Sequence, residues 1–269
     1  MLRARILVAL FGVPLGVVLV VLGGPAFALG LGLMAILGLH EFYTLTRPYR
    51  PNLLVGYLAA LGILAGTYFA GFAGLFGGFT ALLGLLFFWG MGGRLGHHLV
   101  GRMAVTALGV VWIAVGFAYV VLLRGLEHGL ALTVLVVGGT WVNDTFAFFV
   151  GRAFGRRRMA PRISPKKTVE GALAGIVGAL LFALGVKMYS PWLRWRDAAV
   201  LGVVVGVVGQ WGDLFESAVK RDLQVKNSGR LFPGHGGVLD RFDSVLFAGM
   251  AAYWGAVLVL KETVGGLLP

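Results

Sequence analysis

The chain has 269 residues, of which 58% are hydrophobic and 13% are charged, and its mean hydropathy is +0.89. Soluble domains carry about 25% charged residues, so this composition excludes an ordinary soluble domain and predicts an integral membrane protein. The absence of cysteine excludes disulfides, thiolate zinc sites and cysteine nucleophiles. The net charge of +12 fits loops that face an anionic leaflet, so we expect membrane lipids as partners and no nucleic acid.

The apolar residues fall into stretches long enough to cross a membrane, which takes about 20 residues. The first stretch has a basic start like a signal peptide, but apolar sequence resumes directly after "GGP", which favours two membrane helices. Only glycines, near Gly71–Gly74, divide the third stretch from the fourth. We therefore expect an all-α polytopic bundle of about nine helices, at 6–22, 26–45, 53–70, 74–91, 103–123, 130–150, 169–189, 198–218 and 243–260.

The basic residues indicate how the bundle is oriented. If nine helices alternate in direction, 18 of the 23 Lys and Arg residues lie on the side of the N-terminus. Because cytoplasmic loops are enriched in Lys and Arg, this predicts a cytoplasmic N-terminus and a C-terminus outside. We expect a multi-pass protein of a bacterial-type cytoplasmic membrane, with its active site at the cytoplasmic face.

The acidic residues divide the chain unevenly. Up to about residue 125, Glu41 is the only one. We therefore expect residues 1–125 to form a scaffold with possible dimer contacts. Residues 126–269 form the expected catalytic region, with polar cytoplasmic loops at 151–168 and 219–242. No internal repeat suggests an inverted-repeat transporter.

Carboxylates lie at the ends of two consecutive apolar stretches. In "GQWGDLFESAVKRD", Asp213, Glu216 and Lys220 are spaced i, i+3, i+7, so a helix places them on one stripe. In "DRFDS", Asp240 and Asp243 share a face as the next helix begins. Converging carboxylates without cysteine predict a Mg²⁺ site at Asp213, Asp240 and Asp243, and hence a phosphate substrate. Singly, these acids also fit structural roles, such as a helix cap at Asp243 or an ordinary helix pair between Glu216 and Lys220.

Two loops have the composition of phosphate-binding segments. In "PGHGG", glycines flank His235 and leave room for a phosphate chain, with Lys226 before it and Arg241 after it. A tight turn would explain the glycines, but not the accompanying charges. In "ISPKKTVEG", Ser164 or Thr168 caps a helix, and the lysines before the helix start are candidate phosphate ligands.

A longer pattern unites these segments. The stretch "SAVKRDLQVKNSGRLFPGHGGVLDRFDS", Ser217 to Ser244, resembles the signature of the phosphatidate cytidylyltransferase family, also called CDP-diacylglycerol synthases. The upstream "QWGDLFES" and "ISPKKTVEG" are also similar to family segments, and the resemblance covers roughly residues 140 to 244. One departure is Asn227, where the family usually has Asp, so Asn227 is left out of the expected site.

The resemblance implies that CTP and phosphatidate give CDP-diacylglycerol and pyrophosphate. It also implies Mg²⁺ as cofactor and a homodimer, and it leaves room for a second cation, which includes a monovalent one. The expected catalytic residues are Asp213, Asp240, Asp243, Lys167 and Lys220. The expected substrate contacts are Ser164, Lys166, Lys167, Thr168, Glu216, Ser217, Arg221, Lys226, Gly234, His235, Gly236, Gly237, Arg241 and Asp144, the last near the end of the sixth stretch.

Two other classes of function share some of these features. A secondary transporter with ion-coupling acids at Asp144 and Asp213 would need acids near the membrane midplane, whereas these cluster at one face. A CTP-dependent lipid kinase would also use Asp-rich loops and Mg²⁺. The Ser217–Ser244 stretch favours the cytidylyltransferase over both.

Overall fold

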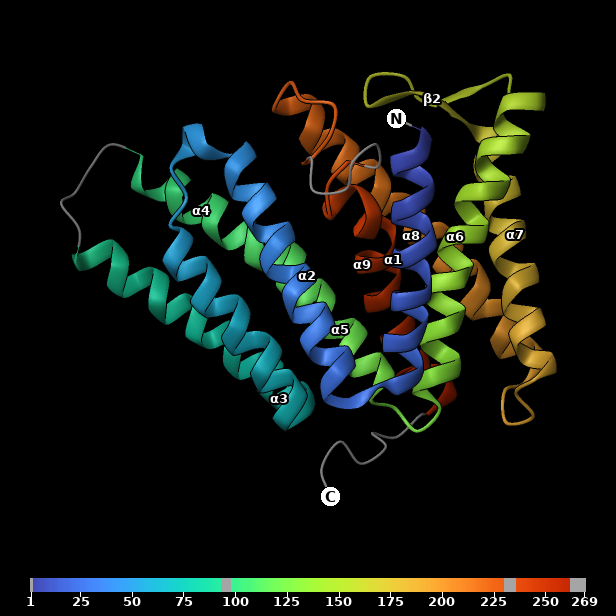
Figure 1. Ribbon diagram of the computed structural model, residues 1–269, viewed down its shortest axis with the longest axis horizontal. Helices are drawn as coiled ribbons and strands as arrows, with labels where there is room; N and C mark the ends of the chain where they lie inside the picture. Colours follow the sequence, from blue (N-terminus) through green and yellow to red (C-terminus); the bar gives the residue numbers. More distant parts are fainter. Residues whose placement is uncertain (1, 93–97, 230–235, 262–269) are drawn as a thin grey trace. The chain divides into compact units, whose positions relative to one another are not determined.

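The structure, a computed structural model, describes residues 2–92, 98–229 and 236–261, with side chains from Leu10 onward (Figure 1). Within these ranges, seven helices are long and apolar enough to cross a membrane, which confirms the all-α polytopic class. The chain forms two compact units. Of the described residues, unit 1 comprises those up to Gly125 together with 227–229 and 236–241, and unit 2 comprises Leu126–Lys226 and 242–261.

Unit 1 contains the N-terminal helices, and their observed ends lie within a few residues of most predicted ones. Residues Leu99–Arg124 form one continuous apolar helix that contains a π-helical turn in its middle. The elements are α1 (Leu2–Leu22), α2 (Gly24–Leu45), the 3₁₀ turn η1 (Arg47–Tyr49), α3 (Leu53–Gly92), α4 (Leu99–Gly109), η2 (Val110–Ala114) and α5 (Val115–Arg124).

Helix α3 is a hairpin of two helices, as the sequence predicts. Forty residues would extend about 60 Å as one straight helix, twice the thickness of a membrane core. The backbone breaks at Ala70 and Gly71, and Gly71 has a φ of 57°, which glycine adopts without strain. The two arms then meet at Gly66 and Gly74, so closely that a Cβ on Gly74 would overlap the Gly66 carbonyl.

Unit 2 contains the helices that carry most of the predicted site. They are α6 (Gly129–Phe154), α7 (Val169–Met188), α8 (Trp195–Asp222) and α9 (Leu239–Gly255), which begins in unit 1 and is extended by the π-helical turn η3 (Ala256–Leu260). Small residues bring the first three together: a Cβ on Gly171 would lie 2.7 Å from the Ala147 carbonyl oxygen, and one on Gly206 3.0 Å from the Ile176 Cα.

The predicted loop at 151–168 proves to be largely a β-hairpin. Strands β1 (Arg158–Ala160) and β2 (Ser164–Thr168) pair antiparallel between α6 and α7. Two backbone bonds fix the hairpin, from Ile163 N to Ala160 O across the turn and from Val169 N to Arg157 O at its base. Two three-to-five-residue strands within a basic, Pro-containing segment give little periodic signal, so the sequence does not reveal them.

Candidate active site

Strand β2 places the Lys167 side chain beside the carboxylate of Asp213 on α8. Successive side chains of a strand point to opposite sides, and here Lys166 is exposed while Lys167 is half-buried. The Lys167 ammonium donates to Asp213 Oδ2 in a close ion pair, and each side chain is 27% exposed. The pair is therefore screened from bulk water yet open enough for a ligand to reach.

The stripe predicted on α8 forms. Ser217 Oγ donates to Asp213 Oδ1 at 3.3 Å, one turn along the helix. Lys220 Nζ lies 3.0 Å from Glu216 Oε2, and the Glu216 side chain is only 2% exposed. Two carboxylates and two ammonium groups thus alternate over a short distance at one end of unit 2.

Asp243 of α9 joins this cluster. Its carboxyl group lies close enough to Asp213 and Glu216 for mutual repulsion, and within hydrogen-bonding reach of Glu216. A glycine makes the approach possible, because a Cβ on Gly212 would lie 2.4 Å from the Asp243 carbonyl oxygen. The spacing of the acids predicted that Asp213 faces both Asp240 and Asp243, and the structure brings Asp243 close to it. We refer to Lys167, Asp213, Glu216, Ser217, Lys220 and Asp243 as the charged cluster.

The charged cluster has the donor chemistry that a hard divalent cation uses. Three carboxyl groups face one another there with two ammonium groups, so a cation would relieve the remaining repulsion. Across the described ranges, however, no group of three or more His, Asp and Glu side chains is already arranged as a metal site. Mg²⁺ binds through one or two carboxylates plus substrate phosphates, so Asp213 and Asp243 fit it without a third protein ligand.

A buried amide network lies deeper in unit 2. Gln210 Nε2 donates to Asn143 Oδ1 at 2.9 Å and to the Ala172 carbonyl oxygen at 2.8 Å, which links α6, α7 and α8. The Asn143 side chain is fully buried and donates to Asp144 at 3.3 Å, whereas Asp144 itself is exposed. Asp144 was predicted as a site residue from the sequence, and Gln210 was not. The one feature of the sequence that could have indicated Gln210 is its position as an amide residue within an apolar stretch.

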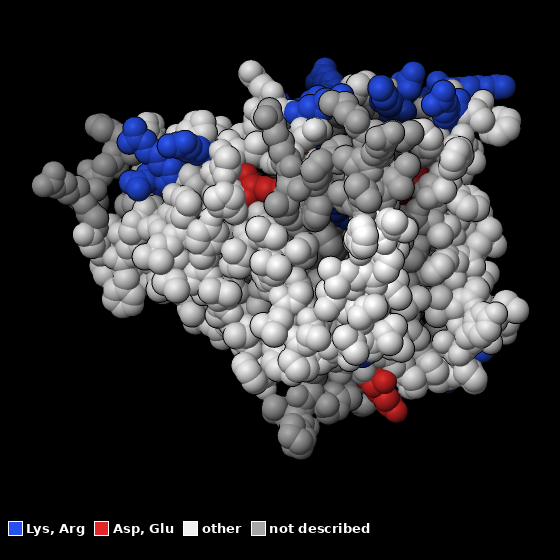
Figure 2. Space-filling model, in the orientation of Figure 1, with Lys and Arg blue, Asp and Glu red and all other residues white. Residues whose placement is uncertain are grey.

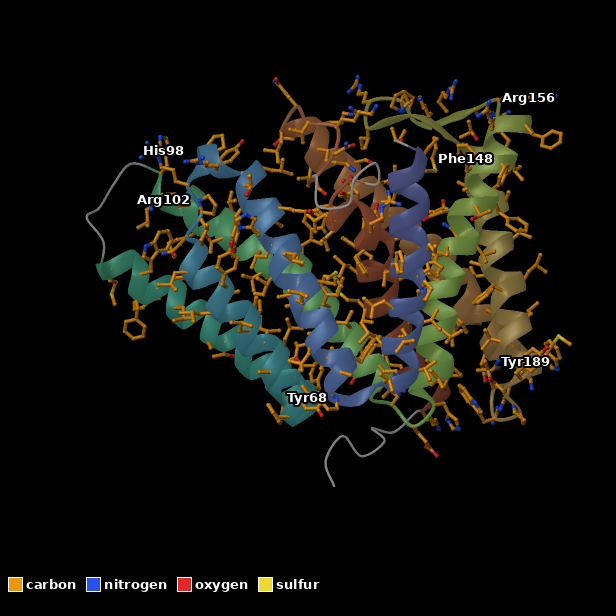
Figure 3. All side chains as sticks on the ribbon, in the orientation of Figure 1. Tyr68, His98, Arg102, Phe148, Arg156 and Tyr189 are labelled. Carbon is orange, nitrogen blue, oxygen red and sulfur yellow. The ribbon has the colours of Figure 1, made fainter. Side chains whose placement is uncertain are left out.

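The hairpin is fixed to the helices at both sides. Thr168 caps α7 by accepting the Gly171 N–H at 3.2 Å, as one of the two predicted caps. Glu170 accepts the backbone N–H groups of Arg156 at 3.0 Å and Arg157 at 3.2 Å. Arg221 Nε donates to the Ile163 carbonyl at 3.1 Å. Lys and Arg side chains gather over this end of unit 2 (Figure 2), and Arg156 lies opposite Tyr189, which follows α7 at the other end (Figure 3).

Asp240 contacts two residues of unit 1, Ser228 and Gly237. Its Oδ2 accepts the Gly237 N–H at 2.8 Å, the Ser228 hydroxyl at 2.9 Å and the Ser228 N–H at 3.0 Å. One carboxylate oxygen therefore organises the start of α9 and the chain before it. A metal-ligand role for Asp240 stays a prediction.

The remaining predicted site residues are placed as follows. Lys226 and Asn227 are exposed, and so is Arg241 in the first turn of α9. Ser164 begins β2 and is partly buried. Gly236 has a φ of 87°, a conformation that favours glycine. Gly234 and His235 lie outside the described residues.

Comparison with known proteins adds independent information. The sequence profile of a family described as "Cytidylyltransferase family" matches residues 3–259. A phosphatidate cytidylyltransferase of Synechocystis is 34% identical, with 95% of this chain and 97% of the relative aligned. The enzymes of that name from Bacillus subtilis and Thermotoga maritima are 40% and 39% identical, over 54% and 47% of this chain and 55% and 49% of their own lengths.

Proposed function

Because the chain belongs to the cytidylyltransferase family, we propose that it transfers CMP from CTP to phosphatidate. A phosphate oxygen of phosphatidate attacks the α-phosphorus of CTP, and the bond from that phosphorus to the bridging oxygen breaks. The products are CDP-diacylglycerol and pyrophosphate. The observation that carries this assignment within the structure is the charged cluster, in which lysines and carboxylates from β2, α8 and α9 meet.

The reaction brings two anions together, so it depends on positioning and on neutralising charge. Lys167 and Lys220 supply positive charge in a half-buried setting, where it acts more strongly than in water. Their partners Asp213 and Glu216 hold both ammonium groups in place before substrate arrives. The attacking oxygen is already anionic, so the chain needs no strong general base.

Mg²⁺ is the proposed cofactor, held by Asp213 and Asp243, with Asp240 the third expected ligand. When bound, it would neutralise phosphate charge of the nucleotide. Lys167 exchanges its contact with Asp213 for a substrate phosphate, which leaves the carboxylate available to the cation. Ser217 keeps the Asp213 carboxylate oriented through its hydroxyl.

A pocket of ≈ 650 Å³ near the hairpin suits the lipid substrate. It lies between the end of α6 and the start of α7, and its lining combines apolar side chains with Arg156, Arg157 and Glu170. The Glu170 carboxylate accepts the backbone N–H groups of the two arginines. Phe154 and Leu173 are 71% and 60% exposed there, as expected for side chains that face acyl chains. Phosphatidate would approach from the leaflet, and CTP from the cytoplasm. We further propose a bacterial-type cytoplasmic membrane and a homodimer.

Product analysis with purified protein in detergent tests the proposal. With CTP, phosphatidate and Mg²⁺, the wild type is expected to form CDP-diacylglycerol and one pyrophosphate per turnover, and Asp243→Asn is expected to lose this activity. Release of CDP with a phosphorylated lipid would identify a lipid kinase instead. Absence of both products from well-folded wild type would refute the assignment.

A further inference from the structure

Glu41 lies far from the signature stretch in the sequence, yet its side chain contacts Ser228 as well as Val238 and Leu239 within that stretch. It projects from α2, in unit 1, and is 9% exposed. Its Oε1 accepts the Val238 N–H at 3.0 Å, and its Oε2 accepts the Leu239 N–H at 3.2 Å and the Ser228 hydroxyl at 3.3 Å. Three donors therefore converge on one buried carboxylate.

These contacts amount to a helix cap supplied by another helix. Val238 directly precedes α9 and Leu239 is its first residue. The N–H groups at the start of a helix have no partner within the helix. A carboxylate satisfies them and is also favoured by the helix dipole. Gly38, one turn before Glu41, leaves room for the same residues, since a Cβ there would lie 3.2 Å from a Leu239 methyl group.

Ser228 couples Glu41 to Asp240. Its hydroxyl has a single hydrogen and lies 3.3 Å from Glu41 and 2.9 Å from Asp240, while it accepts the Asp240 N–H at 3.3 Å. The two carboxylates thus hold one serine between them. Neighbouring glycines permit this, because a Cβ on either Gly229 or Gly237 would lie 2.3 Å from a Glu41 oxygen.

We propose that Glu41 is a positioning residue for the transfer reaction, an inference that rests on the proposed function. Its carboxylate fixes Ser228 and the start of α9 relative to each other, and so sets the spacing across which the signature stretch presents its basic side chains to CTP. The position requires an acceptor of several hydrogen bonds, which explains why one acid stands in an otherwise carboxylate-free half of the chain.

Glu41→Gln tests this, because it keeps the shape and replaces one acceptor oxygen by a donor. Hydrogen–deuterium exchange should show faster exchange in peptides covering 227–241, and no change in α7. The activity, kcat/KM for CTP, should fall roughly 100-fold, as displacements of about 1 Å can cause. Raising the Mg²⁺ concentration should not restore it, unlike the loss from a weakened metal site.

Thr46→Val is the matched control. Thr46 is buried and directly follows α2, five residues beyond Glu41, and its hydroxyl donates to the Phe42 carbonyl at 2.7 Å. This variant should change neither the exchange of 227–241 nor kcat/KM by more than about twofold.

Gly237→Ala provides a second variant should Glu41→Gln fail to fold, since its methyl group would displace the carboxylate and produce the same exchange pattern. Wild-type exchange rates and activity in both variants would overturn the inference. An inactive wild type would refute the proposed reaction instead, and the exchange experiment would still report on Glu41.

Discussion

At the scale of single residues, the charged cluster is an arrangement in which each lysine has its own carboxylate. Lys167 pairs with Asp213 across two elements, and Lys220 pairs with Glu216 along one helix. The first pair joins strand β2 to helix α8, so it forms only when these two elements are packed together. The second pair lies within α8 and could form in that helix alone. The two pairs therefore make different predictions.

Removing either member of the first pair should cost most of the activity. We expect Lys167→Met and Asp213→Asn each to lower kcat/KM roughly 100-fold, because each removes preorganised charge at the phosphates. The double variant should lose far less than the product of the two, since the residues act as a unit. Initial rates with CTP and phosphatidate measure this.

Lys187→Met is the control for that cycle. Lys187 lies in the last turn of α7 and donates to the Ser190 carbonyl at 3.3 Å. The Lys187→Met variant should have the same initial rates as the wild type. Fully multiplicative losses in the double variant, about 10⁴-fold, would mean that Lys167 and Asp213 act separately.

At the scale of elements, glycine decides how closely helices approach. Gly212→Ala places a methyl group against the Asp243 carbonyl, so α9 must move away from α8. We expect a loss of about 1–3 kcal/mol in stability and at least tenfold in kcat. Gly185→Ala in α7, where nothing lies within 4 Å, is the control and should be neutral or slightly stabilising. Equal effects of the two variants on rate would contradict this reading.

The α3 hairpin supplies a second pair of variants. Gly74→Ala would overlap the Gly66 carbonyl in the opposite arm, and the backbone there has no flexible side chain that could yield. Thermal unfolding in detergent should show a drop in Tm of several degrees, from about 1–3 kcal/mol of overpacking. Gly77→Ala, with open space around it, should unfold like the wild type. A Gly74→Ala variant with the Tm of the wild type would contradict the close contact between Gly66 and Gly74 in α3.

The apolar stretches predicted the helices because burial in a membrane requires long runs of one kind of residue. The stripe of Asp213, Glu216 and Lys220 followed from helical spacing. The contact of Asp213 with Asp243 followed from the tendency of consecutive elements to lie next to each other. The hairpin β1–β2 is local, but strands this short give little periodic signal. The Gln210 network depends on contacts between segments distant in the chain. Local patterns do not encode such contacts, which is also why Glu41 stood out only as an isolated acid.

At the scale of the whole molecule, the distribution of charge predicts an orientation in the membrane. The chain contains no cysteine, so single cysteines can report it without altering a native thiol. Arg162 lies in the exposed turn of the hairpin that precedes α7, and Tyr189, which is 90% exposed, follows the other end of α7. An impermeant maleimide should label Arg162→Cys only in inverted vesicles and Tyr189→Cys only in intact spheroplasts. The reverse pattern would place the charged cluster outside the cell.

The contact between Glu41 and the start of α9 also bears on how this protein could be divided. A fragment that begins at residue 126 would contain every residue of the stretch that resembles the family signature. It would nevertheless lack the carboxylate that caps the helix on which Asp240 and Asp243 stand. If Glu41 positions this helix as we propose, a split gene would have to supply the N-terminal helices in trans, and activity from two co-expressed halves would depend on Glu41 in the first.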